Sequence, residues 1–470
     1  MKIPLLPLGK WIPEPGIAPK HALMNPTDRN RPPRRDEMME RYLDAGFWID
    51  RLEHRQLPLM DAAAIARFNQ RGFNQDPSLI DLASLPDHLS ASVLSGMVRD
   101  ISKAPQYPLY LSNGYPVETQ DYRQLETNMD LPGPRTETEV RFGLVLQRTD
   151  MRTWPSALTA YKDEATIDLD RFQENGLFPG DGVAVLHESL DGNWYFACSY
   201  NYAAWVRKAH IAMADRQTVM DYGKADPFLV VTGSKATTNY NPRRPAISEL
   251  QLDMGLRLPL VNSEPDSPNV DGQNPFTSYA VQLPVRDSGE MTLHTALIAR
   301  SQDVQRGFLD YTPENIIRQG FKFLGERYGW GHSYNSRDCS GLVTEIFRSF
   351  GILIPRNTRQ QVSSLLGHTV RFGADDHRET RMEAIRNLAV GDLIYSPGHV
   401  MIYIGSHEER PFVLHDTSSS ISFRTGDEDR YEGILNGVSV TPLLSLRDEE
   451  GRRYLDTMWA IKRITSGSQH

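Results

Sequence analysis

The strongest constraint on the fold lies in the C-terminal part of the chain, where helical patterns come first and strand patterns follow. Thr312-Pro313 predicts a helix start, because Thr is a good N-cap and Pro suits the first helical position. A second helix is predicted from Cys339, and its apolar stripe stops at Gly351, a favourable residue after a helix. Short strands are expected at 392–395, 399–404, 412–415, 438–440 and 458–461. Helices followed by an antiparallel sheet predict an α+β domain.

The middle of the chain has the patterns of small β domains. Strands are predicted at 140–146, 183–186 and 193–197, and Asp191-Gly192 precedes the last of them. An Asp-Gly pair between apolar runs predicts a type I′ hairpin, in which both central residues have positive φ. A second set of strands is expected at 227–231, 279–283 and 291–298, with a turn at 287–289 and a loop or arm over 233–249. Two tandem small barrels are therefore predicted.

The N-terminal part is expected to be an extended arm followed by helices. Up to about residue 35 the sequence is rich in proline and ends in an arginine cluster at 29–35, which we interpret as a solvated arm rather than a phosphate-binding one. A helical region is predicted over 36–102, where Asp61 stands before Ala62, Ile65 and Phe68. In its later segment Leu89, Val93 and Val98 are expected on the apolar face. A chain of 470 residues is long enough for about three such domains or more.

Charge and hydropathy exclude several partners. Lys plus Arg number 51 and Asp plus Glu 60, a net charge of -9, so the chain lacks the positive field that binds nucleic acid. Mean hydropathy is -0.47, and no apolar run reaches the roughly 18 residues of a membrane span. The first ten residues are too short and too broken by proline for a signal peptide. The protein is therefore expected in the periplasm or cell envelope if a signal has been removed, with the cytoplasm and muropeptide recycling as the alternative.

The chemistry is concentrated around Cys339. Asp338 is a natural N-cap, which places Cys339 in the first helical turn, where free N–H groups and the helix dipole favour a thiolate. A nucleophilic thiol needs an imidazole base, and His399, at the start of a predicted strand, is the first candidate. His415, in the next strand, is the candidate for the residue that orients His399.

Each of these residues alone is more often structural than functional. A cysteine at a helix start, a histidine opening a β-branched strand and a polar histidine in the next strand are, however, an uncommon combination. The chain has only two cysteines, so at most one disulfide is possible, and Cys198, within a predicted strand, is expected to be structural. No C-x-x-C pattern occurs, so neither a metal nor another cofactor is expected.

Residues from about 306 to 470 resemble the NlpC/p60 cysteine peptidases. The resemblance rests on Tyr328-Gly329-Trp330-Gly331-His332, on Asp338-Cys339-Ser340-Gly341-Leu342-Val343, on Gly398-His399-Val400 and on His415. It implies Cys339 as nucleophile, His399 as base and His415 as the orienting third member. It also implies that Tyr328 and Trp330 line the substrate cleft, while Asp338 and Ser340 contact the peptide end that carries a free amine. Gly331-His332 departs from the usual Gly-Gly.

The preceding chain resembles the multidomain branch of this family. The similar segments are 148–155 and Ala204-Trp205-Val206. This resemblance implies an arm and helical stabilising segment at 1–125, a first SH3-like barrel at 126–215, a second at 216–305 and the peptidase domain at 306–470. The first barrel would close one end of the cleft, with Tyr195, Tyr200 and Tyr202 as equal candidates.

The expected function is that of a papain-like cysteine endopeptidase. The resemblance implies cleavage of peptidoglycan stem peptides or muropeptides with a free N-terminal L-alanine, at the bond between γ-D-glutamate and a diamino acid. One alternative is a non-catalytic cell-wall-binding protein, against which the presence of Cys339, His399 and His415 together argues. Another is an amidase or acyltransferase with the same thiol chemistry, because the nucleophile does not specify the acyl acceptor.

Overall fold

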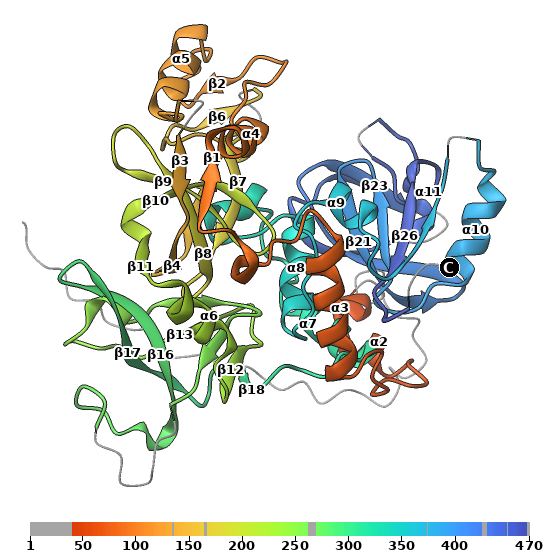
Figure 1. Cartoon of the computed structure of the whole chain (residues 1–470). Helices are drawn as coiled ribbons and strands as arrows, with labels where there is room; N and C mark the ends of the chain where they lie inside the picture. The colour runs from red at the N-terminus through yellow and green to blue at the C-terminus, as the bar shows by residue number, and fades with distance from the viewer. Residues whose placement is uncertain are drawn as a thin grey trace, which may run out of the picture. The chain divides into compact units, whose positions relative to one another are not determined.

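The computed structural model describes residues 40–133, 136–163, 167–261, 269–373, 375–424, 430–448 and 450–467. The expected N-terminal arm and its arginine cluster lie outside these ranges. Tyr42–His470 is one compact unit, and its elements are labelled in Figure 1. Within the described ranges every helix is too short or too polar to cross a lipid bilayer.

The N-terminal segment is helical, as predicted. Asp61 caps α3 by accepting a hydrogen bond from Ala64 N at 2.7 Å. The expected apolar face of the later helix is partly wrong: Leu89 lies in a short strand, and Val93 is 50% exposed. Val98 is buried as predicted, and Leu94 is buried in place of Val93, because residues four apart share a helix face. The elements are η2 (Arg41–Leu43), α2 (Ala45–Ile49), α3 (Ala62–Gln75), η3 (Leu82–Ser84), β1 (His88–Ser90), α4 (Ala91–Ile101), β2 (Tyr110–Leu111) and α5 (Thr119–Asn128).

Seven strands then form one antiparallel sheet in the order β11-β4-β8-β9-β10-β5-β7. The hairpin predicted at Asp191-Gly192 joins β8 to β9, but its turn is not of type I′. Five residues separate the two strands, and of the Asp-Gly pair only Gly192 has a positive φ, of 68°. The Asp191 carboxylate instead accepts from Ser189 Oγ and Asn193 N. The strands of this sheet are β4 (Arg141–Val145), β5 (Thr149–Arg152), β7 (Gln173–Leu177), β8 (Gly182–Glu188), β9 (Trp194–Cys198), β10 (Ala203–Arg207) and β11 (Ile211–Ala214), with η5 (Lys208–His210) before the last. Two further strands of this region, β3 (Glu137–Glu139) and β6 (Ala160–Tyr161), pair with β1 and β2.

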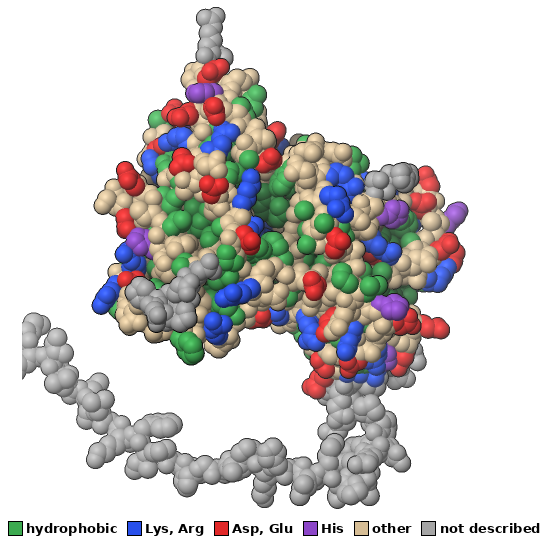
Figure 2. Space-filling view, turned by 60° about the horizontal axis from the view of Figure 1, so that its bottom comes forward, with side chains coloured by type: hydrophobic (Ala, Val, Ile, Leu, Met, Phe, Trp, Pro, Cys, Tyr) green, Lys and Arg blue, Asp and Glu red, His purple; other side chains and the backbone are tan. Residues whose placement is uncertain are grey.

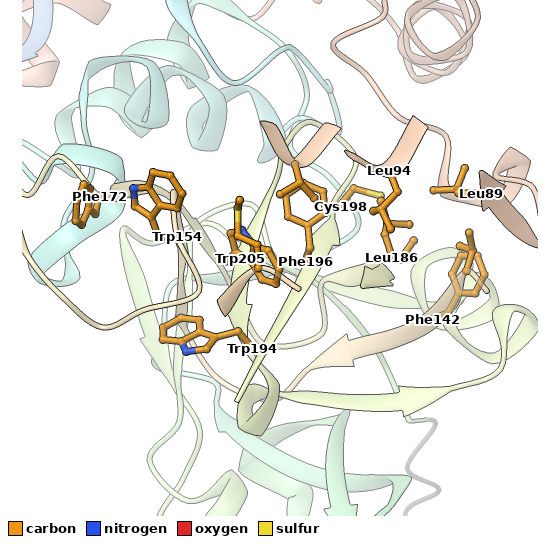
Figure 3. Packing of buried hydrophobic residues seen from close by; sticks show 14 of the residues in the cluster. Leu89, Leu94, Phe142, Trp154, Phe172, Leu186, Trp194, Phe196, Cys198 and Trp205 are labelled. Carbon is orange, nitrogen blue, oxygen red and sulfur yellow. The ribbon is translucent and has the colours of Figure 1, made fainter. Parts of the chain in front are cut away.

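One core joins this sheet to the N-terminal helices. Figure 3 shows Leu89 and Leu94 beside Leu186, Phe196 and Cys198 of the sheet. The Cys198 side chain is fully buried in this cluster. The helical segment and the sheet therefore share one hydrophobic core.

The second β region contains the other predicted strands. Its main hairpin, β16–β17, turns at Ser288 and Gly289 with φ of 51° and 92°, so here both turn residues have positive φ. The expected loop over 233–249 contains one strand, β13, which pairs with β14. The elements are α6 (Arg216–Lys224), β12 (Phe228–Val231), β13 (Lys235–Thr237), η6 (Pro245–Ile247), β14 (Gln251–Asp253), β15 (Arg257–Pro259), η7 (Pro275–Thr277), β16 (Ser278–Asp287), β17 (Glu290–Ala299) and β18 (Val304–Arg306).

The C-terminal domain places two helices against a six-stranded antiparallel sheet of order β19-β26-β20-β21-β22-β25. Thr312 caps α7 and Asp338 caps α8, as predicted. Gly320 of α7 lies against Leu414 of β22, which puts the helices on that face. The elements are α7 (Pro313–Phe321), η8 (Trp330–Asn335), α8 (Cys339–Arg348), α9 (Thr358–Ser363), β19 (His368–Arg371), α10 (Arg378–Arg386), β20 (Leu393–Ser396), β21 (His399–His407), β22 (Arg410–Thr417), β23 (Ser420–Arg424), β24 (Arg430–Ile434), β25 (Gly437–Pro442), η9 (Leu443–Ser445), α11 (Tyr454–Thr457) and β26 (Ala460–Arg463).

The α2 region packs on the C-terminal sheet through aromatic contacts. The ring of Trp48 lies 5.1 Å from that of Phe412 on β22, and Tyr42 Oη lies 3.0 Å from His407 Nδ1 on β21. The chain is thus a multidomain α+β protein. On the face drawn in Figure 2, basic and acidic side chains are interspersed, as the modest net charge suggests.

Candidate active site

Helix α8 begins at Cys339. Asp338 lies just before it, and its Oδ1 accepts a hydrogen bond from Gly341 N at 2.8 Å, which satisfies one of the free N–H groups of the first turn. The Cys339 side chain is 6% exposed. The predicted position of this cysteine at a helix N-terminus is therefore confirmed.

His399 and His415 lie side by side on neighbouring strands. His399 Nε2 is 2.9 Å from His415 Nδ1, and His415 Nε2 is 2.9 Å from Thr441 Oγ1 on β25. Met401 pairs with His415 in the β21–β22 ladder, which sets the register that brings the two rings together. The structure thus forms a continuous chain of two imidazoles and a hydroxyl, and Thr441 is a member that sequence reasoning missed.

The sulfur of Cys339 faces the start of β21. Its S–H donates to Gly398 O at 4.0 Å, and it also receives a hydrogen bond from Val400 N–H. These two backbone groups flank His399 in the chain. The structure therefore places the thiol against the backbone on either side of His399.

The expected thiolate at Cys339 is not supported by its surroundings. Burial raises the pKa of the thiol to about 12, and the neighbouring Asp338 carboxylate acts in the same direction. Burial lowers the pKa of His399 to about 4, and burial with the neighbouring His399 lowers that of His415. The resting site is therefore a neutral thiol beside a neutral imidazole. Here the loss of hydration outweighs the helix dipole, which contributes only about 0.3–2 kcal/mol.

The loop before α8 has an unusual backbone. Gly331 and His332 both have positive φ, of 56° and 68°. The His332 ring is buried: its Nε2 lies 3.0 Å from Glu345 Oε1, and Arg356 Nη2 donates to its Nδ1 at 3.1 Å. A Cβ on Gly341 would lie 2.7 Å from this ring, so glycine is required there. The histidine that replaces the usual second glycine is thus held inside the domain.

Tyr328 and Trp330 lie at the two ends of the segment that leads into this loop. Tyr328 is 6% exposed, and burial together with Cys339 raises the pKa of its hydroxyl. Trp330 Nε1 donates to Gln173 O at 3.0 Å, and Arg171 lies 4.4 Å from its ring. Tyr328 is therefore close to Cys339, and Trp330 contacts the seven-stranded sheet.

Both side chains predicted to contact the free amine are engaged within the protein. Arg356 is the main partner: its Nη2 donates to Asp338 Oδ2 at 2.7 Å and its Nη1 to Oδ1 at 3.0 Å. Gly331 N and Ser340 Oγ also donate to Asp338. Arg356 holds the pKa of this carboxyl well below its usual range. Arg356 was missed from sequence, where it is simply an arginine after a proline.

The seven-stranded sheet reaches this cluster through Glu174 and Asn175. Arg356 Nε donates to Asn175 Oδ1 at 2.6 Å, and Glu174 accepts from Tyr202 Oη at 2.5 Å. Of the three candidate tyrosines, Tyr202 is the one bonded to this cluster. Tyr195 lies near Lys208 and Arg141, and Tyr200 near Arg348.

Two family models match the chain over these elements. The model of the NlpC/P60 family matches residues 325–439, which include Cys339, His399 and His415. The C-terminal part of the chain is an NlpC/P60 domain. The model of the SH3 domain of the SH3b1 type matches residues 159–207, which lie in the seven-stranded sheet. That sheet is therefore the first SH3-like barrel of the prediction, and the fold class is confirmed.

Curated relatives match only parts of the chain. A γ-D-glutamyl-L-lysine dipeptidyl-peptidase from Bacillus cereus is 30% identical over 190 residues, which are 38% of this chain and 48% of that protein. Dipeptidyl-peptidase 6 from Lysinibacillus sphaericus is 26% identical and covers 46% of this chain and 72% of its own length. The chain thus spans about half the length of the first of these relatives.

A solved structure covers nearly all of the chain. An NlpC/P60 endopeptidase from Photobacterium damselae subsp. piscicida aligns with 91% of this chain and 98% of its own, with a TM-score of 0.70. Its sequence identity is 17%, so the likeness concerns the fold alone.

Proposed function

We propose that the chain is a cysteine endopeptidase that hydrolyses peptidoglycan stem peptides at the bond between γ-D-glutamate and a diamino acid. The single observation that carries the proposal is that Cys339 lies against the backbone next to His399, whose ring is hydrogen-bonded to His415 and through it to Thr441. The relatives that are named γ-D-glutamyl-L-lysine dipeptidyl-peptidases support the choice of bond.

The neutral resting pair determines how the nucleophile is formed. His399 accepts the thiol proton as Sγ attacks the amide carbonyl, and the Cys339 N–H of the first α8 turn stabilises the oxyanion. His399 then returns the proton to the departing amine as the C–N bond breaks. Water, deprotonated by His399, attacks the acyl carbonyl, and His399 returns that proton to the Cys339 sulfur as the C–S bond breaks. His415 accepts from His399 Nε2–H and donates to Thr441 Oγ1, which leaves His399 Nδ1 free to face the sulfur.

The charges beside the nucleophile fit a substrate with a free amine. Asp338 and Glu174 carry two carboxyls; Arg356 is bonded to Asp338, and the other guanidinium near Glu174, that of Arg152, is paired with Asp170. Burial raises the pKa of Glu174, so an ammonium group would stabilise its ionised form and complete the balance of charge. We propose that Asp338, Ser340, Glu174 and Tyr202 receive the N-terminal L-alanine, with Tyr202 closing the cleft, and that Tyr328 and Trp330 line it.

Defined muropeptides analysed by mass spectrometry test the proposal. The expected products are an L-alanyl-γ-D-glutamate dipeptide and a fragment that begins with the diamino acid. N-terminal acetylation of the peptide should slow cleavage about tenfold or more, because the charge-assisted hydrogen bonds of the ammonium are lost. Glu174→Gln should lessen this discrimination, while Glu188→Gln, on β8 of the same barrel and paired with Lys208, should preserve it. Binding without cleavage, or transfer to an added amine instead of water, would point to the two alternative functions.

A further inference from the structure

A carboxyl group next to the candidate site has no hydrogen-bond partner. Asp416 follows His415 on β22, its side chain is 0% exposed, and both of its carboxyl oxygens lack a partner among the described residues. A buried polar group in this condition costs free energy, and a charged one costs more. The local packing alone therefore gives no reason for an aspartate at this position.

The groups around Asp416 belong to the active site. An ionised Asp416 would raise the pKa of both Cys339 on α8 and Tyr328 in the segment before it. Three other charged groups face Asp416: the carboxylates of Asp338 and Glu326, and the guanidinium of Arg337. That guanidinium does not neutralise Asp416, because it is paired with Glu326, Asp253 and Glu345.

We infer that Asp416 is an active-site acid that stays neutral while the enzyme works and, when it ionises, suppresses formation of the Cys339 thiolate. This inference rests on the proposed function of Cys339 as a nucleophile. Burial, with Asp338 and Glu326 next in effect, raises the pKa of Asp416 well above its usual range. Ionisation releases its proton to solvent and leaves a second negative charge near the sulfur. Asp416 thus sets an alkaline limit on the enzyme without touching the substrate.

The pH dependence of the melting temperature reports the ionisation of Asp416, and this measurement needs no substrate. A carboxyl whose pKa is raised by folding stabilises the fold least at high pH, where the folded protein must hold an unpaired buried charge. The melting temperature of Asp416→Asn should therefore exceed that of the wild type by an amount that grows above about pH 4 and levels off where Asp416 has ionised. Asp416→Ala provides the same comparison if the amide variant folds poorly.

Thiol reactivity measures the consequence at Cys339. The probe is iodoacetamide, with labelling of the Cys339 peptide followed by mass spectrometry across pH 5 to 10. Asp416→Asn should match the wild type at low pH and react about tenfold faster above the pH at which the stability difference levels off. Ser396→Ala is the matched control: Ser396 Oγ, on β20, is also buried with no hydrogen-bond partner among the described residues, but carries no charge. In Ser396→Ala, the labelling of Cys339 should depend on pH in the same way as in the wild type.

Two results would overturn the inference. Equal labelling of Asp416→Asn and wild type at every pH would mean that Asp416 does not act on the thiol. A constant ratio at every pH would mean that Asp416 is already ionised in the working enzyme. Neither measurement needs turnover, so a failure to cleave muropeptides would count against the proposed function and leave this inference testable.

Discussion

The two cysteines of the chain have nearly the same burial and very different neighbours. Burial raises the thiol pKa to about 12 in both Cys198 and Cys339. Cys198 lies in the middle of β9 within an apolar core, whereas Cys339 opens α8 beside the backbone groups that flank His399. The comparison teaches that thiol acidity alone does not distinguish a nucleophile from a core residue. What distinguishes Cys339 from Cys198 is the position of Cys339 beside the candidate base His399.

The largest expected difference between the two cysteines is in turnover. Cys339→Ala should reduce muropeptide hydrolysis by about 10⁴-fold or more, because no other group replaces the nucleophile. Cys198→Ala should retain nearly full activity and lose some stability, because it leaves a small cavity in the core. Progress curves and thermal melts of both variants check this. Comparable loss of rate in the two variants would contradict the assignment of Cys339 as the nucleophile.

Without His399 as its base, Cys339 should be as inactive in turnover as Cys198. His399→Ala is expected to slow turnover nearly as much as loss of the thiol, since no other group there accepts its proton. His415→Ala should slow it less, because water can partly replace an orienting partner. Rates of the two purified variants decide the roles, and a slower His415 variant would reverse them.

The loss of stability at low pH should depend on His399 and not on Cys198. Burial lowers the pKa of His399 from its unfolded value of 6.5 to about 4, so the unfolded chain binds more protons between these values. The wild type should therefore lose about 3 kcal/mol of stability from this group as pH falls from 6.5 to 4. Denaturant melts at several pH values measure this loss. In His399→Ala it should be smaller, whereas Cys198→Ala should retain it in full.

The smallest expected effect is at the far end of the histidine chain. Thr441→Val keeps the shape of the side chain and removes the hydrogen bond to His415 Nε2. We expect kcat to fall by about threefold to tenfold, with a lower melting temperature, because one ring nitrogen is left unsatisfied. Ser439→Ala, on the same strand and opposite His415 in the ladder, is the control. An unchanged kcat in Thr441→Val would remove Thr441 from the site.

Local signals in the sequence predicted the helix starts and most strands. Thr312, Asp338 and Asp61 cap their helices because an N-cap acts over three residues of the same chain. The hairpin at Asp191-Gly192 was located correctly, but its turn type was wrong, because Ser189 and Asn193 bind the Asp191 carboxylate and favour a longer loop.

By itself, the sequence determined that a cysteine opens a capped helix and that two histidines follow on strands. Only the tertiary structure decided the rest of the site. Thr441 meets His415 through strand register, and Arg356 reaches Asp338 across the domain. The charge state of Cys339 was predicted incorrectly, because a helix dipole can be inferred from local sequence but burial cannot. Desolvation depends on every residue packed around the sulfur, and those residues are distant in the chain.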